Sequence, residues 1–101
     1  MAYIHKKKRS NRPGHKYDLR RRERNKIYNS ARWQQIRAWK VVEQPLCEMC
    51  LQDDKVTPVE EVHHIVSFMS TDDPIKRNFL AYDYSNLMSV CQVCHQKIHN
   101  R

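Results

Sequence analysis

The sequence has no long apolar run and almost no glycine. No stretch of its 101 residues approaches the ~18–20 apolar residues that a membrane-spanning helix needs. A single glycine excludes a collagen-like chain. The basic N-terminus, MAYIHKKKRS, is not followed by an apolar core, so we expect no secretory signal. We therefore expect a cytoplasmic protein whose thiols stay reduced.

Acidic residues are scarce in the first forty residues. That segment holds fourteen Lys and Arg against Asp18 and Glu23, a net charge of +12, whereas residues 41–101 carry −4. Such an arm favours a polyanion, with salt-dependent affinity and little base specificity. A solubilising tail is the alternative. The side chains expected to bind DNA phosphates are Lys6, Lys7, Lys8, Arg9, Arg12, Lys16, Arg20, Arg21, Arg22, Arg24 and Lys26.

We expect two parts, a basic arm at residues 1–28 and a folded domain at residues 29–101. Residues 1–16 contain almost no apolar side chain, so we expect them to be disordered, and we expect residues 17–27 to become helical on DNA. A chain this short is marginal on hydrophobic burial alone. It therefore needs a disulfide or a metal ion to stabilise it.

The folded domain should begin with a helix. Asn29 or Ser30 can cap it, and Pro45 ends it. Its apolar side chains recur every three residues, and we expect them to pack on the core rather than to stack on bases; they are Trp33, Ile36, Trp39 and Val42.

Two strands and a last helix should follow. Residues 59–66 are rich in β-branched side chains and predict a strand, and residues 87–90 predict a second, short strand. The residues between them, 67–85, are expected to form a polar connection. A helix is expected at residues 95–100. These elements predict a small α+β fold.

The four cysteines form two Cys-x-x-Cys pairs separated by forty residues. Each pair can present two thiolates to one ion, and together they predict a closed, structural zinc site made of Cys47, Cys50, Cys91 and Cys94. Two disulfides are the alternative if the protein is exported. Residues 91–95 also match the haem attachment pattern, but covalent haem needs export and leaves the first pair unexplained.

Four histidines are placed to form a second metal site. His63 and His64 are adjacent in a predicted strand and should point to opposite sides. His95 and His99 lie four residues apart on one helix face, so both can bind one ion. One of the strand histidines would complete three ligands and leave positions for water or phosphate. Alternatively, the histidines have a structural role or simply lie on the surface, or His95 or His99 replaces a cysteine as a ligand of the structural zinc.

The order of these motifs resembles the HNH endonuclease family and its ββα-metal, or His-Me finger, fold. The matching residues are Cys47-x-x-Cys50, Val62-His63-His64-Ile65, Asn86-Leu87 and Cys91-x-x-Cys94-His95-x-x-x-His99. The helix before the first cysteine pair also resembles small phage-type members. The resemblance implies a metal-dependent DNA endonuclease whose small α+β domain is stapled by the four-cysteine zinc site and preceded by a helix and a basic arm.

The resemblance also implies a role for each matching residue. His64 would be the general base that activates water, and Asn86 would hold that histidine in orientation. His63, His95 and His99 would bind a catalytic divalent ion. The family more often has aspartate in place of His63. Three imidazoles favour Mn²⁺, Ni²⁺ or Zn²⁺ more than Mg²⁺.

Small phage-type members imply partners as well. We expect double-stranded DNA as the substrate, with weak sequence specificity, and a role beside phage terminase in DNA packaging. The compartment would be the cytoplasm of a bacterial host, and the protein a monomer or weak dimer. The rival interpretation is a non-catalytic, zinc-stabilised module that binds nucleic acid. Binding alone would not require the histidines and Asn86.

Overall fold

The computed structural model describes residues 15–99, which form five α-helices and a two-stranded antiparallel sheet. Their order is α1 (His15–Tyr28), α2 (Ala31–Glu43), α3 (Glu48–Gln52), β1 (Glu61–His64), α4 (Pro74–Tyr82), β2 (Leu87–Val90) and α5 (Gln92–His99), with short 3-10 helices η2 (Phe68–Ser70) and η3 (Tyr84–Asn86) on either side of α4. The disorder expected for residues 1–16 lies outside the described residues except at its end, where the expectation is wrong because His15 and Lys16 begin α1.

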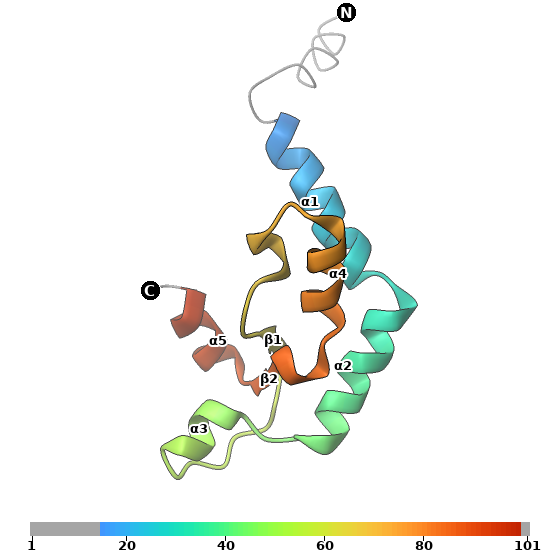
Figure 1. Ribbon diagram of the computed structural model, residues 1–101. Coiled ribbons are helices and arrows are strands. Elements are labelled where there is room, and N and C mark those ends of the chain that lie inside the picture. The colour runs from blue at the N-terminus through green and yellow to red at the C-terminus, as the bar shows by residue number, and fades with distance from the viewer. Residues whose placement is uncertain (1–14, 100–101) are drawn as a thin grey trace, which may run out of the picture.

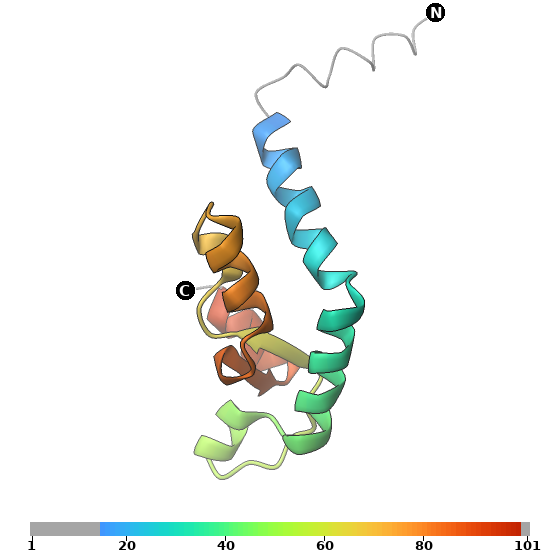
Figure 2. The same ribbon diagram turned by 45° about the vertical axis from the view of Figure 1, so that its right-hand side comes forward.

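Helices α1 and α2 run along one side of the molecule, and the remaining elements lie on the other (Figures 1 and 2). Ser30 separates the two helices and caps α2 as predicted, because its hydroxyl accepts the Trp33 N–H at 3.2 Å. Only part of the predicted apolar face is buried: Trp33 is 3% exposed, but Trp39 is 56% and Val42 78% exposed. The prediction is wrong for the second half of the helix, because a repeat of three drifts around 3.6 residues per turn.

Helix α1 packs on the domain. Ile27 in its last turn is buried in a cluster with Phe68 of η2 and Ala81 of α4. Further up the helix, the Arg20 guanidinium pairs with the Asp72 carboxylate at 2.7 Å. Contacts within the chain therefore hold this part of the basic arm against the domain as a helix, and a further effect of DNA on it stays a prediction.

The connection between the strands contains a helix that the sequence analysis missed. Asp73 caps α4 by accepting the Ile75 N–H at 3.0 Å, and Pro74 occupies the first turn. An aspartate followed by proline is a typical helix start, which the polar composition of the segment obscured. Through Ala81 and Tyr82, α4 helps to enclose the buried face of the sheet.

Strands β1 and β2 pair so that His63 lies opposite Met88. Burial alternates along β1: Val62 and His64 are buried, whereas Glu61 and His63 are partly exposed. Successive side chains of a strand point to opposite faces, so the sheet separates the two adjacent histidines, as predicted.

The remaining boundaries are close to the prediction. Strand β2 spans residues 87–90 as predicted, β1 is shorter than the predicted 59–66, and α5 begins at Gln92 rather than at His95. The two strands and α5 form a ββα unit, which confirms the α+β class. Within residues 15–99, no helix is both long enough and apolar enough to cross a membrane.

The packing of α1 predicts the effect of truncating Ile27. Because its side chain is 6% exposed, Ile27→Ala should destabilise the fold by about 2 kcal/mol or more. Leu19→Ala on the same helix should change stability by less than about 0.5 kcal/mol, since Leu19 is 46% exposed. Urea denaturation of both variants measures the difference. Equal midpoints for the two would show that α1 does not pack on the domain.

Candidate functional site

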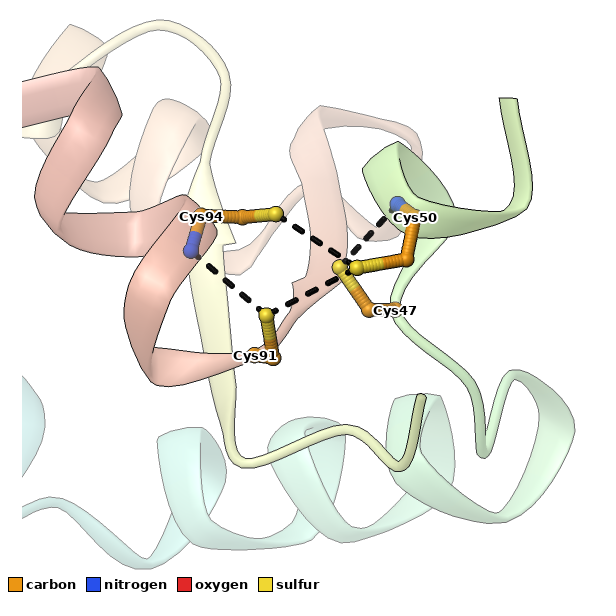
Figure 3. A group of neighbouring side chains, drawn as sticks. All are labelled: Cys47, Cys50, Cys91 and Cys94. Carbon is orange, nitrogen blue, oxygen red and sulfur yellow. Dashed lines mark hydrogen bonds between the residues drawn. The ribbon is translucent and has the colours of Figure 1, made fainter. Parts of the chain in front are cut away.

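Four thiols meet where α3 and α5 approach each other (Figure 3). The Cys50 sulfur lies 3.8 Å from that of Cys91 and 3.6 Å from that of Cys94, and the sulfurs of all four, including Cys47, lie within 4.8 Å of one another. All four are free thiols and are not paired in disulfides. Metal–sulfur bonds of about 2.3 Å in a tetrahedron place sulfurs about 3.8 Å apart. The cluster therefore fits a zinc ion.

Backbone N–H groups also favour thiolates here. The Cys50 N–H donates to the sulfur of Cys47 at 3.4 Å, and the Cys94 N–H to that of Cys91 at 3.5 Å. Burial opposes ionisation of Cys47, but hydrogen bonds from backbone and thiol groups outweigh it and lower the pKa to about 7. Burial instead raises the pKa of Cys94 to about 12. A metal cation bound among the sulfurs would favour their thiolate form.

Three imidazoles meet on the more exposed face of β1. The ring centre of His63 lies 5.3 Å from that of His95 and 5.6 Å from that of His99, which come from successive turns of α5. One nitrogen from each ring lies within 4.8 Å of the others, and the Nε2 atoms of His95 and His99 are 3.0 Å apart. Metal–nitrogen bonds of about 2.1 Å at right angles give a spacing of about 3.0 Å. The cluster therefore fits one divalent cation.

The environment of His63 favours its neutral form. The pKa of His63 is lowered, first by burial and then by the neighbouring rings of His95 and His99. A neutral imidazole is the form that binds a metal ion. His99 is exposed and His95 partly exposed, so the cluster is open to solvent.

His64 lies on the opposite face of β1 in an aromatic cage. Its ring stacks on Trp33 at 4.8 Å and meets the Phe68 ring edge-on at 4.8 Å. Its Nε2 is 3.0 Å from the Ala81 carbonyl oxygen. Because a carbonyl only accepts hydrogen bonds, Nε2 carries the proton and the lone pair is on Nδ1. Burial lowers the pKa of His64 more than the Ala81 bond raises it, so the ring is neutral near pH 7.

The two histidines of β1 share a small pocket. His64 is only 6% exposed, but a pocket of about 70 Å³ is lined by both His63 and His64. A larger pocket of about 330 Å³ reaches His95, and it shares Tyr28 and Val62 with the smaller one. His64 and His63 therefore line one pocket, and His95 lines a second pocket that shares two residues with the first.

Asn86 does not contact His64 directly. Its side chain accepts the Val66 N–H at 2.8 Å and donates to the carbonyl oxygens of Val66 and Leu80, both at 2.9 Å. These bonds join the segment after β1 to the end of α4, next to Ala81. The Ala81 carbonyl contacts His64, and Asn86 connects to that ring through the backbone between Leu80 and Ala81.

The described part of the basic arm lies on α1. Arg21, Arg22 and Lys26 are exposed, Arg24 is partly exposed, and Arg20 contacts Asp72. Lys16 lies in α1, but its side chain is not described. The other expected DNA contacts, Lys6, Lys7, Lys8, Arg9 and Arg12, lie outside the described residues.

Sequence reasoning missed a cation beside the imidazole cluster. Arg37 of α2 lines the larger pocket together with His95 and Trp33. A signal was present, since Arg37 follows the buried Trp33 by four residues and therefore lies on the same face of α2. Arg37 was grouped with the other basic residues of the first forty, so its place beside the buried Trp33 was not recognised.

Comparisons with known proteins agree with this geometry. The family model described as HNH endonuclease matches residues 47–101, which include both metal clusters. The chain is also similar to the crystal structure of an HNH endonuclease from the deep-sea thermophilic bacteriophage GVE2 with a manganese ion. The two share 28% sequence identity over 88% of this chain and 91% of that one, with a TM-score of 0.69. No curated protein matches the sequence.

The thiol cluster predicts a strong dependence of stability on zinc. Cys47→Ser should lower the melting temperature by at least about 10 °C, because it removes one of four ligands from a site that supports a small core. A strong chelator should bring the unmodified protein to a similar melting temperature. Circular dichroism and metal analysis check both. Unchanged zinc content and melting in the variant would contradict the structural role.

Proposed function

Because the chain belongs to the HNH endonuclease family and is thus a nuclease, we propose that it hydrolyses DNA phosphodiesters with one divalent ion on His63, His95 and His99 and with His64 as general base. The observation that carries this proposal is the separation of the adjacent histidines. One belongs to the imidazole cluster, and the other is a caged, neutral ring that lines a pocket together with the first. A module that only binds nucleic acid requires neither.

His64 would remove a proton from the water that attacks phosphorus. Its Nδ1 lone pair is available because the Ala81 carbonyl holds the proton on Nε2. The same carbonyl would stabilise the imidazolium that forms, as an acceptor behind a catalytic histidine does. Trp33 and Phe68 fix the plane of the ring, and Asn86 fixes the backbone that carries Ala81.

When bound, the divalent ion supplies Lewis-acid polarisation of the scissile phosphate and stabilises the charge on the leaving 3′ oxygen. His63, His95 and His99 would hold it as neutral ligands and would therefore leave its positive charge available to the phosphate. The related phage enzyme was crystallised with manganese. Mn²⁺, Ni²⁺ and Zn²⁺ suit three imidazoles better than Mg²⁺ does.

The basic arm would hold the DNA by its phosphates. Arg21, Arg22 and Lys26 present positive charge on the exposed surface of α1, the part of the arm that adjoins the domain. Such contacts position the duplex and read no sequence. Three expectations stay predictions that rest on the resemblance to small phage-type members. They are that the protein acts beside a terminase, that it works in the cytoplasm of a bacterial host, and that it is a monomer or a weak dimer.

Separate variants of the two strand histidines test the assignment of roles. His64→Ala should lower the rate of plasmid cleavage by at least about 100-fold, because the general base is lost. It should leave Mn²⁺ affinity unchanged, since this ring is not a ligand. His63→Ala should lose both cleavage and Mn²⁺ binding. Plasmid nicking assays and calorimetric titration measure the two properties.

The controls separate an enzyme from a binding module. Cleavage by the unmodified protein should require added divalent ions and stop with EDTA. DNA affinity should be similar in all three proteins. A His64→Ala protein that cuts at the unmodified rate would show that the assigned base is wrong, and absence of cleavage with every ion tested would favour the binding module.

The arm should set the salt dependence of DNA binding. Lys7→Gln with Lys8→Gln should flatten the slope of log K against log salt by about 0.9 for each phosphate that the arm no longer neutralises. Lys55→Gln with Lys76→Gln removes the same charge from outside the arm and should change the slope less. Fluorescence anisotropy at several salt concentrations compares them. Equal slopes in both double variants would contradict a role for the arm.

A further inference from the structure

One carboxylate touches the imidazole cluster without belonging to it. The Oε2 atom of Glu61 lies 3.2 Å from Nδ1 of His95. The cluster itself consists of three imidazoles and has no acidic ligand among the described residues. Glu61 can therefore affect metal binding at the cluster through its contact with His95.

Strand geometry explains why Glu61 reaches this ring. Glu61 and His63 are two residues apart in β1, so their side chains project from the same face of the sheet. Helix α5 contacts β1. His95 thus lies between two partners: Nδ1 faces Glu61, and Nε2 faces His99 at 3.0 Å.

This arrangement determines which nitrogen of His95 carries the proton. An ionised carboxylate only accepts hydrogen bonds, so the contact requires a proton on Nδ1. The lone pair is then on Nε2, directed at the other two imidazoles. Ligating histidines commonly donate their second N–H to a carboxylate, which fixes the ring and makes it a stronger ligand.

We propose that Glu61 is a positioning residue for the catalytic metal: it holds His95 with Nε2 toward the ion and supplies, through that ring, negative charge that the all-imidazole set lacks. The inference rests on the three-histidine site proposed above. Glu61 thus has a different role from the adjacent Glu60. Glu60 instead accepts the Gln92 N–H at 2.9 Å, at the start of α5.

Mn²⁺ affinity of the zinc-loaded full chain tests the proposal without relying on cleavage. Glu61→Ala should weaken Mn²⁺ binding about 10–100-fold in calorimetric titration, because it removes both the acceptor and the charge. Glu61→Gln keeps an acceptor but loses the charge, so its loss should be smaller. Glu60→Gln, the matched control, removes the same charge one residue away and should bind as the unmodified protein does.

The tautomer of His95 provides a second readout. In zinc-loaded, manganese-free protein, imidazole ¹⁵N shifts should show His95 with its proton on Nδ1. Glu61→Ala should shift that ring toward a mixture of tautomers, whereas Glu60→Gln should not. A purely structural role of Glu61 would leave the tautomer unchanged. Thermal melts of each variant show whether the fold is intact.

The His63→Ala variant distinguishes failure of this inference from failure of the proposed function. If His63→Ala abolishes Mn²⁺ binding while both Glu61 variants bind as the unmodified protein does, the role of Glu61 is wrong and the metal site stands. If His63→Ala binds Mn²⁺ as tightly as the unmodified protein, the three-histidine site is wrong and the inference fails with it.

Discussion

The pleat of strand β1 is the constraint on which the site depends. It sends His63 toward α5 and His64 toward α2 and α4, so that neighbouring residues of one type acquire different environments. One ring joins two other imidazoles at the surface, and the other is enclosed by aromatic rings and a carbonyl. A slip of one residue in the pairing with β2 would exchange the two environments. The site therefore requires a firmly held register.

The thiol cluster is well placed to hold that register. It joins α3 to the start of α5, which directly follows β2. Glu48 of α3 strengthens the link, because its carboxylate accepts the Ser89 N–H of β2 at 2.7 Å and lies 3.2 Å from the Lys40 ammonium of α2. The buried clusters of the described residues are small, and one of them consists of three cysteines with Val90. A zinc ion among these sulfurs would therefore substitute for part of the missing core and also brace the strands.

Features that depend on short spacings along the chain could be predicted from the sequence. The two Cys-x-x-Cys pairs, the four-residue spacing of His95 and His99, and the cap at Ser30 each follow from short-range geometry. Contacts between distant segments could not be predicted from the sequence. The Ala81 carbonyl behind His64 has no side-chain signature, and it comes from a helix that a polar composition concealed. The packing of α1 was missed because its many charges obscured the single buried anchor, Ile27.

The central claim is that the two faces of β1 perform separate tasks, metal binding and proton transfer. Anomalous diffraction from crystals of the zinc-loaded protein soaked in Mn²⁺ examines it most directly. The account predicts a zinc peak among the four sulfurs and a manganese peak bonded to His63, His95 and His99 at about 2.0–2.2 Å, with His64 outside its ligands. A manganese peak bonded to His64, or none at the three histidines, would contradict it.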